Sequence, residues 1–272
     1  MNKKLFCTDL DDTLLCADKS VTAENIDALH ELQEKGHYFA IVSGRSIAGS
    51  KMIFQTLGLN KKNCFLVSFQ GNVIFDLEKD EIVSRHGMDP EVVIRLLSEC
   101  KKRGIYAQTY TTESVMIQEM NDTARKILGV TREAYTMIDD YDSLRDKIMP
   151  KVLIISYEHP EILPPLQKEF KSIEEGKANS FFSCPQYLEY VGIGMDKGVG
   201  LNNLAKYLNM DIKDTIAVGD ERNDLSMIKA AGLGCAMKNA HPDVKEVADY
   251  ITTKDMNHSG VAEVVDKFVL RN

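Results

Sequence analysis

The sequence predicts an α/β protein in which a doubly wound parallel sheet is interrupted by an inserted α+β segment. Three observations lead to this fold class. Strand-like and helix-like segments alternate over the first 80 residues, antiparallel-type segments follow, and strand–helix alternation returns after about residue 190. A chain of 272 residues can form two modest domains. We therefore expect a core at residues 1–81 and 188–272 and an inserted domain at 82–187.

The N-terminal part contains strand, helix, strand, helix and strand in that order. Thr22 is a suitable cap for the first helix, and Gly36 follows its end. Because strands that alternate with helices form parallel sheets, these elements predict a sheet with helices on its faces. The expected strands are residues 5–8, 37–42 and 64–68, and the expected helices are 22–35 and 47–57.

The middle of the chain has a different pattern. Asp89 and Pro90 are typical of a helix start, and Gly104 follows the end of that helix. Residues 106–110 and 115–118 alternate in polarity, which predicts an antiparallel hairpin. The insert is completed by a strand at 152–157, a helix at 160–171 and an extended segment at 181–190.

The C-terminal part returns to short strands and helices. The expected helices are 198–208, 223–231 and 261–268, and the expected strands are 215–218 and 233–237. This return of the alternation places the last third of the chain in the same sheet as the first third.

Composition excludes several classes of partner. The formal net charge is −8 and no Lys/Arg-rich run occurs, so nucleic acid and anionic membranes are poor partners. There is no signal-like apolar start and no apolar run of about 18 residues, so we expect a cytoplasmic protein. The six cysteines form no Cys-x-x-Cys pair and several lie in apolar runs, which favours buried thiols over disulfides or zinc ligands.

Four polar segments each follow a predicted strand or open a predicted helix. They are Asp9-Leu10-Asp11-Asp12-Thr13, Ser43-Gly44-Arg45, Asp196-Lys197-Gly198 and Gly219-Asp220-Glu221-Arg222-Asn223-Asp224. Because the carboxyl ends of parallel strands share one edge of a sheet, the four segments can converge there. Each alone has an ordinary explanation as a turn, a helix cap or a surface lysine, but their order and spacing together favour a functional site.

The residue types in these segments suit phosphoryl chemistry. Asp9, Asp220 and Asp224 offer hard oxygen ligands of the kind that Mg²⁺ prefers. Ser43, with the backbone N–H groups that follow it, can hold anionic oxygens, and Lys197 adds a positive charge. A carboxylate can then accept a phosphoryl group as a nucleophile.

The four segments resemble the four motifs of the haloacid dehalogenase superfamily of phosphohydrolases. The position of the insert, between the second and third segments, resembles the Cof-type branch. The later stretches 236–240, 244–248 and 260–261 extend the resemblance over the whole chain. It implies a Rossmann-like doubly wound core and an inserted α/β cap domain that closes over the active site and sets substrate specificity.

The resemblance also implies residue roles. Asp9 matches the nucleophile that forms an aspartyl-phosphate, and Asp11 matches the general acid that later activates water. Mg²⁺ would be held by the Asp9 carboxylate, the Asp11 backbone carbonyl and Asp220, with Asp224 in support.

The phosphate-binding positions follow in the same way. Ser43, Gly44 and Lys197 match the residues that bind phosphate, and Asn223 matches one that contacts phosphate or steadies the lysine.

The chain departs from the family pattern at two places. The usual Asn-Gly after the third strand is Gln70-Gly71-Asn72 here, and we assign no role to Gln70. Arg222 either reaches an anionic substrate or is a solvated surface residue, and Asp12 is explained by turn chemistry. In the insert, the stretches 111–113 and 179–186 could contact the leaving group.

We therefore expect a Mg²⁺-dependent phosphatase that acts on a small soluble phosphate ester, such as a sugar phosphate, as a monomer or weak homodimer. Two alternatives stay open at this point. One is a phosphotransferase or phosphomutase on the same fold. The other is a catalytically silent binding protein, which predicts loss of at least one chemical group, whereas Asp9, Asp11, Lys197 and Asp220 are all present.

Overall fold

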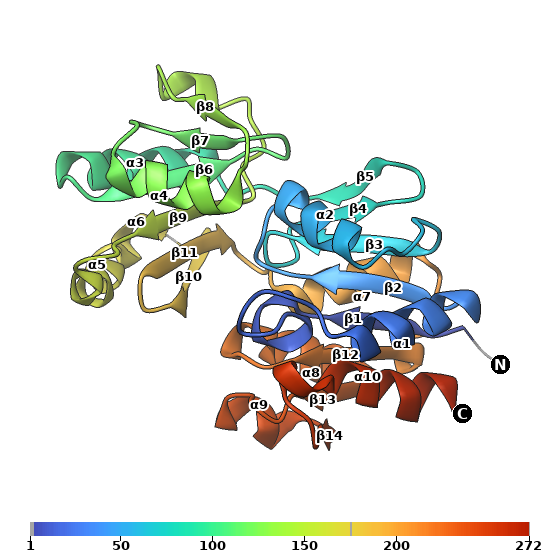
Figure 1. Cartoon of the computed structure of the whole chain (residues 1–272). Coiled ribbons are helices and arrows are strands. Elements are labelled where there is room, and N and C mark those ends of the chain that lie inside the picture. The colour runs from blue at the N-terminus through green and yellow to red at the C-terminus, as the bar shows by residue number, and fades with distance from the viewer. Residues whose placement is uncertain (1–2, 175, 272) are drawn as a thin grey trace. The chain divides into compact units, whose positions relative to one another are not determined.

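The computed structural model describes residues 3–174 and 176–271 and divides into two compact units (Figure 1). The first unit is Met1–Ser84 with Asp196–Asn272, and the second is Arg85–Met195. The boundary expected after residue 187 would cut into β11 (Tyr187–Gly192), which the structure keeps whole in the second unit. A tight turn at Pro185 and Gln186 pairs β11 with β10, so β11 belongs to the sheet of the second unit. The sequence pattern does not reveal this turn.

The first unit contains a largely parallel sheet with the strand order β14-β13-β12-β1-β2-β3-β4-β5. The pairs from β14 to β3 are parallel, and β3 and β4 are antiparallel. The central strands are buried on both faces, as a sheet covered by helices requires. The strands are β1 (Leu5–Thr8), β2 (Tyr38–Val42), β3 (Cys64–Ser68), β4 (Val73–Asp76), β5 (Glu81–Arg85), β12 (Thr215–Gly219), β13 (Leu233–Ala236) and β14 (Tyr250–Ile251).

Helices cover both faces of this sheet. Figure 1 shows α1 and α2 on the side toward the viewer and α7 on the other side. The helices are α1 (Ala23–Glu34), α2 (Ile47–Thr56), α7 (Lys197–Tyr207), α8 (Leu225–Ala230), α9 (Pro242–Val247) and α10 (Gly260–Val265). The short helical turns are η1 (Leu10–Leu14), η4 (Ile212–Asp214), η5 (Arg222–Asp224), η6 (Met256–His258) and η7 (Asp266–Leu270). The predicted doubly wound α/β core is thus confirmed.

The second unit has its own mixed sheet with the order β10-β11-β9-β6-β7-β8. The predicted hairpin is confirmed, since β6 and β7 are antiparallel neighbours, while β7 and β8 run parallel. The strands are β6 (Tyr106–Tyr110), β7 (Val115–Ile117), β8 (Tyr135–Met137), β9 (Lys151–Ile155), β10 (Ala178–Cys184) and β11. The helices are α3 (Pro90–Lys102), α4 (Asp122–Thr131), α5 (Leu163–Glu169) and α6 (Lys171–Glu174), with the turns η2 (Asp142–Leu144) and η3 (Pro160–Ile162).

A separate apolar core supports the second unit. Leu96 and Leu97 of α3 and Phe170 after α5 belong to the same buried cluster as Val152 and Ile154 of β9. The helix expected at 160–171 is broken into η3, α5 and α6. All six cysteines are free thiols, and five of them are buried, as predicted. Within the described parts of the chain, no helix has both the length and the apolar character needed to span a membrane.

Candidate active site

The parallel strands bring the four polar segments to one edge of the first sheet. Because β12, β1, β2 and β3 are parallel neighbours, their carboxyl ends all lie at this edge. Asp9 follows β1, Ser43 follows β2 and Asp220 follows β12, while Lys197 is the first residue of α7. The topology therefore assembles residues that lie far apart in the sequence, such as Asp9 and Asp220.

Lys197 lies at the centre of this assembly. Its side chain is only 1% exposed, and its Nζ donates to Asp9 Oδ1 at 2.7 Å and to Asp224 Oδ1 at 2.6 Å. Burial alone would lower the pKa of Lys197, but the adjacent carboxylates raise it above its usual value. The lysine is therefore charged and holds two carboxylates in fixed positions.

Asp224 orients the loop after β12 as well as the lysine. Its Oδ2 accepts hydrogen bonds from the backbone N–H groups of Asp220, at 2.9 Å, and Glu221, at 3.1 Å. Both oxygens of Asp224 are thus engaged by protein groups. Its geometry suits the supporting role expected from the sequence better than direct metal binding.

Thr13 lies in the site, although the sequence pattern predicts no role for it. Its hydroxyl donates to Asp220 Oδ1 at 2.6 Å and fixes the orientation of that carboxylate. The only available signal was its position at the end of the first acidic segment, where a helix cap or turn explained it equally well.

The buried carboxylates have raised proton affinities. Burial raises the pKa of Asp9 to about 7, although Lys197 acts in the opposite direction. Burial and the negative charges of Asp9 and Asp224 raise the pKa of Asp220 to about 8. Three carboxylates and one lysine carry a formal charge of −2, so the cluster lacks positive charge.

The Asp9 and Asp220 carboxylates fit a divalent cation, with Asp224 beside them in support. One oxygen from each of the three lies within 4.8 Å of the other two. Lys197 occupies Oδ1 of Asp9 and Thr13 occupies Oδ1 of Asp220, which leaves the Oδ2 of both for another ligand. A hard, doubly charged ion matches both the oxygen donors and the missing charge.

Asp11 points to different partners from Asp9. Its carboxylate accepts bidentate hydrogen bonds from Arg45, from Nε at 2.9 Å and from Nη2 at 2.7 Å. It also accepts a hydrogen bond from Lys19 Nζ at 3.0 Å. Burial opposes the effect, but the two cations lower the pKa of Asp11 to about 2. Arg45 belongs to the second polar segment, but the sequence pattern predicts a contact with Asp11 neither for it nor for Lys19.

Ser43 and Asn223 both form hydrogen bonds with Gln70. The backbone carbonyl of Ser43 accepts from the Gln70 N–H at 3.1 Å, and Asn223 Nδ2 donates to Gln70 Oε1 at 3.4 Å. Gly44 packs against the Gln70 amide. In this structure Asn223 therefore contacts Gln70, while Asp9 and Asp224 hold the lysine.

Asp12 and Arg222, which belong to the first and fourth polar segments, have structural contacts instead of a place in the carboxylate cluster. Asp12 is exposed in a left-handed turn, with φ +56°, and its carbonyl accepts from Asn239 Nδ2. The Arg222 side chain is 62% exposed and pairs with Asp243 at 2.9 Å. Arg222 is thus a surface ion-pair residue in this structure, which matches the second of its two interpretations.

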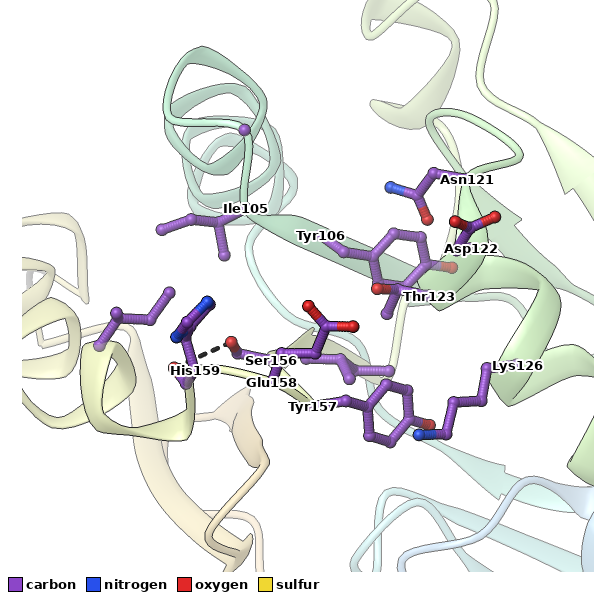
Figure 2. Close-up of a pocket in the computed structure, with 13 residues that line it drawn as sticks. Ile105, Tyr106, Asn121, Asp122, Thr123, Lys126, Ser156, Tyr157, Glu158 and His159 are labelled. Atoms are coloured by element: carbon purple, nitrogen blue, oxygen red, sulfur yellow. Dashed lines mark hydrogen bonds between the residues drawn. The ribbon is translucent and has the colours of Figure 1, made fainter.

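The second unit contains a cavity of about 460 Å³ (Figure 2). It is lined in part by Tyr106, Asp122, Lys126, Tyr157 and Glu158, and Lys126 Nζ lies 4.0 Å from the centre of the Tyr157 ring. Side chains of both signs line it, so it does not select an anion by charge. The stretches 111–113 and 179–186 are not part of its lining.

These two stretches have defined structures of their own. Residues 111–114 form the turn between β6 and β7, where the Thr111 hydroxyl accepts from the N–H groups of Glu113 and Ser114. Most of 179–186 belongs to β10 and its turn.

Comparison with known proteins gives a consistent result. A sequence model of haloacid dehalogenase-like hydrolases matches residues 6–265. The protein YkrA of Bacillus subtilis is 30% identical over 278 residues, covering 99% of each chain. The B. subtilis protein YcsE, named 5-amino-6-(5-phospho-D-ribitylamino)uracil phosphatase, is 27% identical over 267 residues, covering 98% of this chain and 96% of its own.

Solved structures agree with the sequence matches. A haloacid dehalogenase-like hydrolase from Bacteroides thetaiotaomicron superposes with a TM-score of 0.88 at 32% identity, covering 97% of this chain and 99% of that chain.

Proposed function

Since this chain belongs to the haloacid dehalogenase-like hydrolases, we propose that it is a Mg²⁺-dependent phosphatase of small phosphorylated metabolites that works through an aspartyl-phosphate. The observation that carries this proposal is the buried cluster in which Lys197 joins Asp9 and Asp224 beside Asp220. An ordinary structural ion pair does not need a third carboxylate or a net negative charge. A site that binds a cation and a phosphate does need the additional carboxylate and its negative charge.

The Asp9 and Asp220 carboxylates and the Asp11 backbone carbonyl would hold Mg²⁺, with Asp224 orienting the loop after β12. The bound ion supplies positive charge that attracts the phosphate and stabilises charge in the transition state. Lys197 keeps the Asp9 carboxylate fixed through Oδ1, so that one of the two Asp9 oxygens would bind the ion while the other would attack phosphorus.

The proposed reaction has two balanced steps. In the first, an Asp9 oxygen forms a bond to phosphorus, the bond to the leaving oxygen breaks, and that oxygen takes a proton from Asp11. In the second, Asp11 takes a proton from water, the water oxygen bonds to phosphorus, and the Asp9–phosphorus bond breaks. Ser43 and the backbone N–H groups after it would bind the non-transferring phosphate oxygens at the amino end of α2.

Asp11 has to leave Arg45 during this cycle. Both of its oxygens are engaged by Arg45, and Oδ1 also contacts Lys19. In this arrangement the carboxylate form is favoured, so Asp11 is prepared to accept a proton. Donation to a leaving group requires that the Arg45 contact open first.

We further propose that the second unit acts as a cap that contacts the leaving group and excludes water. The substrate class is a phosphate ester of a sugar or a polyol. The name of the relative YcsE supports this class, because the phosphate in its substrate is carried by a ribityl chain.

The test is phosphate release from a panel of sugar and polyol phosphates in the presence of Mg²⁺. We expect turnover that EDTA abolishes and that Asp9→Asn reduces at least about a thousandfold, because the nucleophile is lost. Asp27→Asn, at an exposed position on α1, is the matched control and should retain wild-type turnover. Turnover that survives EDTA or Asp9→Asn would refute the mechanism, and an isomeric phosphate in place of free phosphate would identify a phosphomutase.

A further inference from the structure

The turn after β3 has an unusual backbone. Phe69, Gln70 and Gly71 all have positive φ values, of +53°, +59° and +93°. Phe69 and Gln70 carry side chains, for which this left-handed region is unfavourable. We call residues 69–72 the β3 turn. Such strain persists only where the surroundings hold it, and it is frequent at functional sites.

The β3 turn is bound to the phosphate-binding segment on one side. The Phe69 N–H donates to the Arg45 carbonyl at 2.9 Å, and the Gln70 N–H donates to the Ser43 carbonyl at 3.1 Å. These two backbone bonds fix the turn against the loop after β2.

The β3 turn also contacts the start of α7, where Lys197 lies. A Cβ added to Gly71 would lie 2.1 Å from the Asp196 carbonyl oxygen and 3.2 Å from the Gly200 nitrogen. The backbone of the turn therefore packs directly on the segment that presents the central lysine, and only glycine fits there.

The Gln70 side chain links this turn to the loop after β12. It is 3% exposed, and its Oε1 accepts from Asn223 Nδ2. Its other amide atom, Nε2, lies against Gly44, since a Cβ on that glycine would be 2.5 Å away from it. One buried amide thus spans the distance between the loop after β2 and Asn223.

We propose that Gln70 is a positioning residue for phosphate binding, which holds the Asn223 amide and the Gly44 backbone at a fixed separation. This inference rests on the proposed function and adds a residue to it. The side chain acts through its neighbours: Oε1 fixes the orientation of Asn223, and the amide buttresses Gly44. The Asn223 amide and the Gly44 backbone are then correctly spaced to contact a phosphate.

The first experiment measures the affinity for inorganic phosphate by calorimetry with Mg²⁺ present. Gln70→Ala should weaken phosphate binding about tenfold, the loss typical of a misplaced hydrogen bond. Gln70→Gly removes the same amide but relieves the left-handed strain, so it should fold well and bind phosphate as weakly as the alanine variant. Gln55→Ala, at an exposed position on α2, is the matched control and should bind like wild type.

A second experiment separates positioning from general stability. For a phosphomonoester substrate, Gln70→Ala should raise KM about tenfold and change kcat less than threefold, because a ground-state contact is affected. Asn223→Ala should give a similar loss, and the double variant should lose no more than the larger single effect, because both act through one contact. Gly44→Ala, which forces the Gln70 amide aside, should reproduce the Gln70→Ala phosphate affinity.

Several outcomes would overturn the inference. Wild-type phosphate affinity in both Gln70→Ala and Gln70→Gly would do so, as would full additivity with Asn223→Ala. Failure of the proposed function is a different result: wild-type protein that binds phosphate without turnover, and binds it less well after Gln70→Ala, would refute the phosphatase but support the positioning role. Wild-type protein that binds no phosphate would refute both.

Discussion

Replacing Lys197 with methionine removes the positive charge that pairs with Asp9 and Asp224 in the buried carboxylate cluster. The lysine is 1% exposed and holds Asp9 and Asp224 at 2.7 and 2.6 Å, and Asp224 is fully buried. Methionine fills a similar volume but leaves both carboxylates without their cation. Removal of one partner from a buried ion pair costs about 3–5 kcal/mol, which for a unit of this size lowers Tm by about 10 °C.

The measurement is thermal and denaturant unfolding in EDTA, followed by circular dichroism. Lys206→Met is the matched control, because Lys206 is an exposed residue of the same helix α7 and its loss should change stability by less than about 0.5 kcal/mol. Adding Asp224→Asn to Lys197→Met should recover part of the lost stability, since one of the two stranded charges is then removed.

One contradicting result is a Lys197→Met protein that unfolds within about 2 °C of the Lys206→Met control. Another is an additional Asp224→Asn substitution that makes the protein still less stable by the full amount of its own single effect. Either result would mean that the lysine does not offset the buried negative charge.

Two other predictions concern the first unit. Gly71→Ala should lower the free energy of unfolding by at least about 2 kcal/mol more than Gly36→Ala. Both glycines have positive φ, but only at Gly71 would the added Cβ clash, at 2.1 Å from the Asp196 oxygen. Equal losses in denaturant titrations would contradict this prediction. Although burial opposes it, hydrogen bonds from Tyr250 and nearby backbone lower the pKa of Glu263, so its contribution to stability is present above its unfolded pKa of about 4.3 and is lost as pH falls below it. Glu263→Gln should therefore destabilise the protein more at pH 7 than at pH 3, and a constant difference across this range would refute the assignment.

The sheet core could be predicted because its signals are local and repeated. Each central strand is a short apolar run, and α1 has the Thr22 cap that was expected, with its hydroxyl accepting from the Asn25 N–H. Since parallel order places strand ends at one edge, the convergence of Asp9, Lys197 and Asp220 follows from topology alone.

Elements that depend on tertiary context were not predicted. The α-helix expected at 160–171 begins only at Leu163, with Pro164 and Pro165 in its first turn, since proline lacks the N–H that an interior helical position needs. The extended run at 181–190 is two strands, because a two-residue turn carries no glycine signal here. The short elements β4, β8 and α9 also escaped detection.

Side-chain partners in the site could be predicted least. The contact between Arg45 and Asp11 joins residues 34 positions apart, and it depends on side-chain conformations that no spacing rule encodes. In the sequence, Gln70 stands out only as a departure from the family's Asn-Gly pattern. Its proposed role depends on a left-handed backbone conformation, which glycine and asparagine adopt more readily than glutamine.

The two carboxylates at the end of β1 differ in how firmly they are held, and this difference matches the roles proposed for them. The contact of Lys197 with Asp9 is buried, with side chains 1% and 10% exposed, so breaking it costs several kcal/mol. The contact of Arg45 with Asp11 is 34% and 40% exposed, and pairs of this kind contribute on the order of 1 kcal/mol. A nucleophile gains from a fixed position, whereas a group that carries a proton to and from the substrate has to move. Because opening the Arg45 contact costs so little beside a catalytic barrier, the pairing of Asp11 in this structure is compatible with its role as the acid and base.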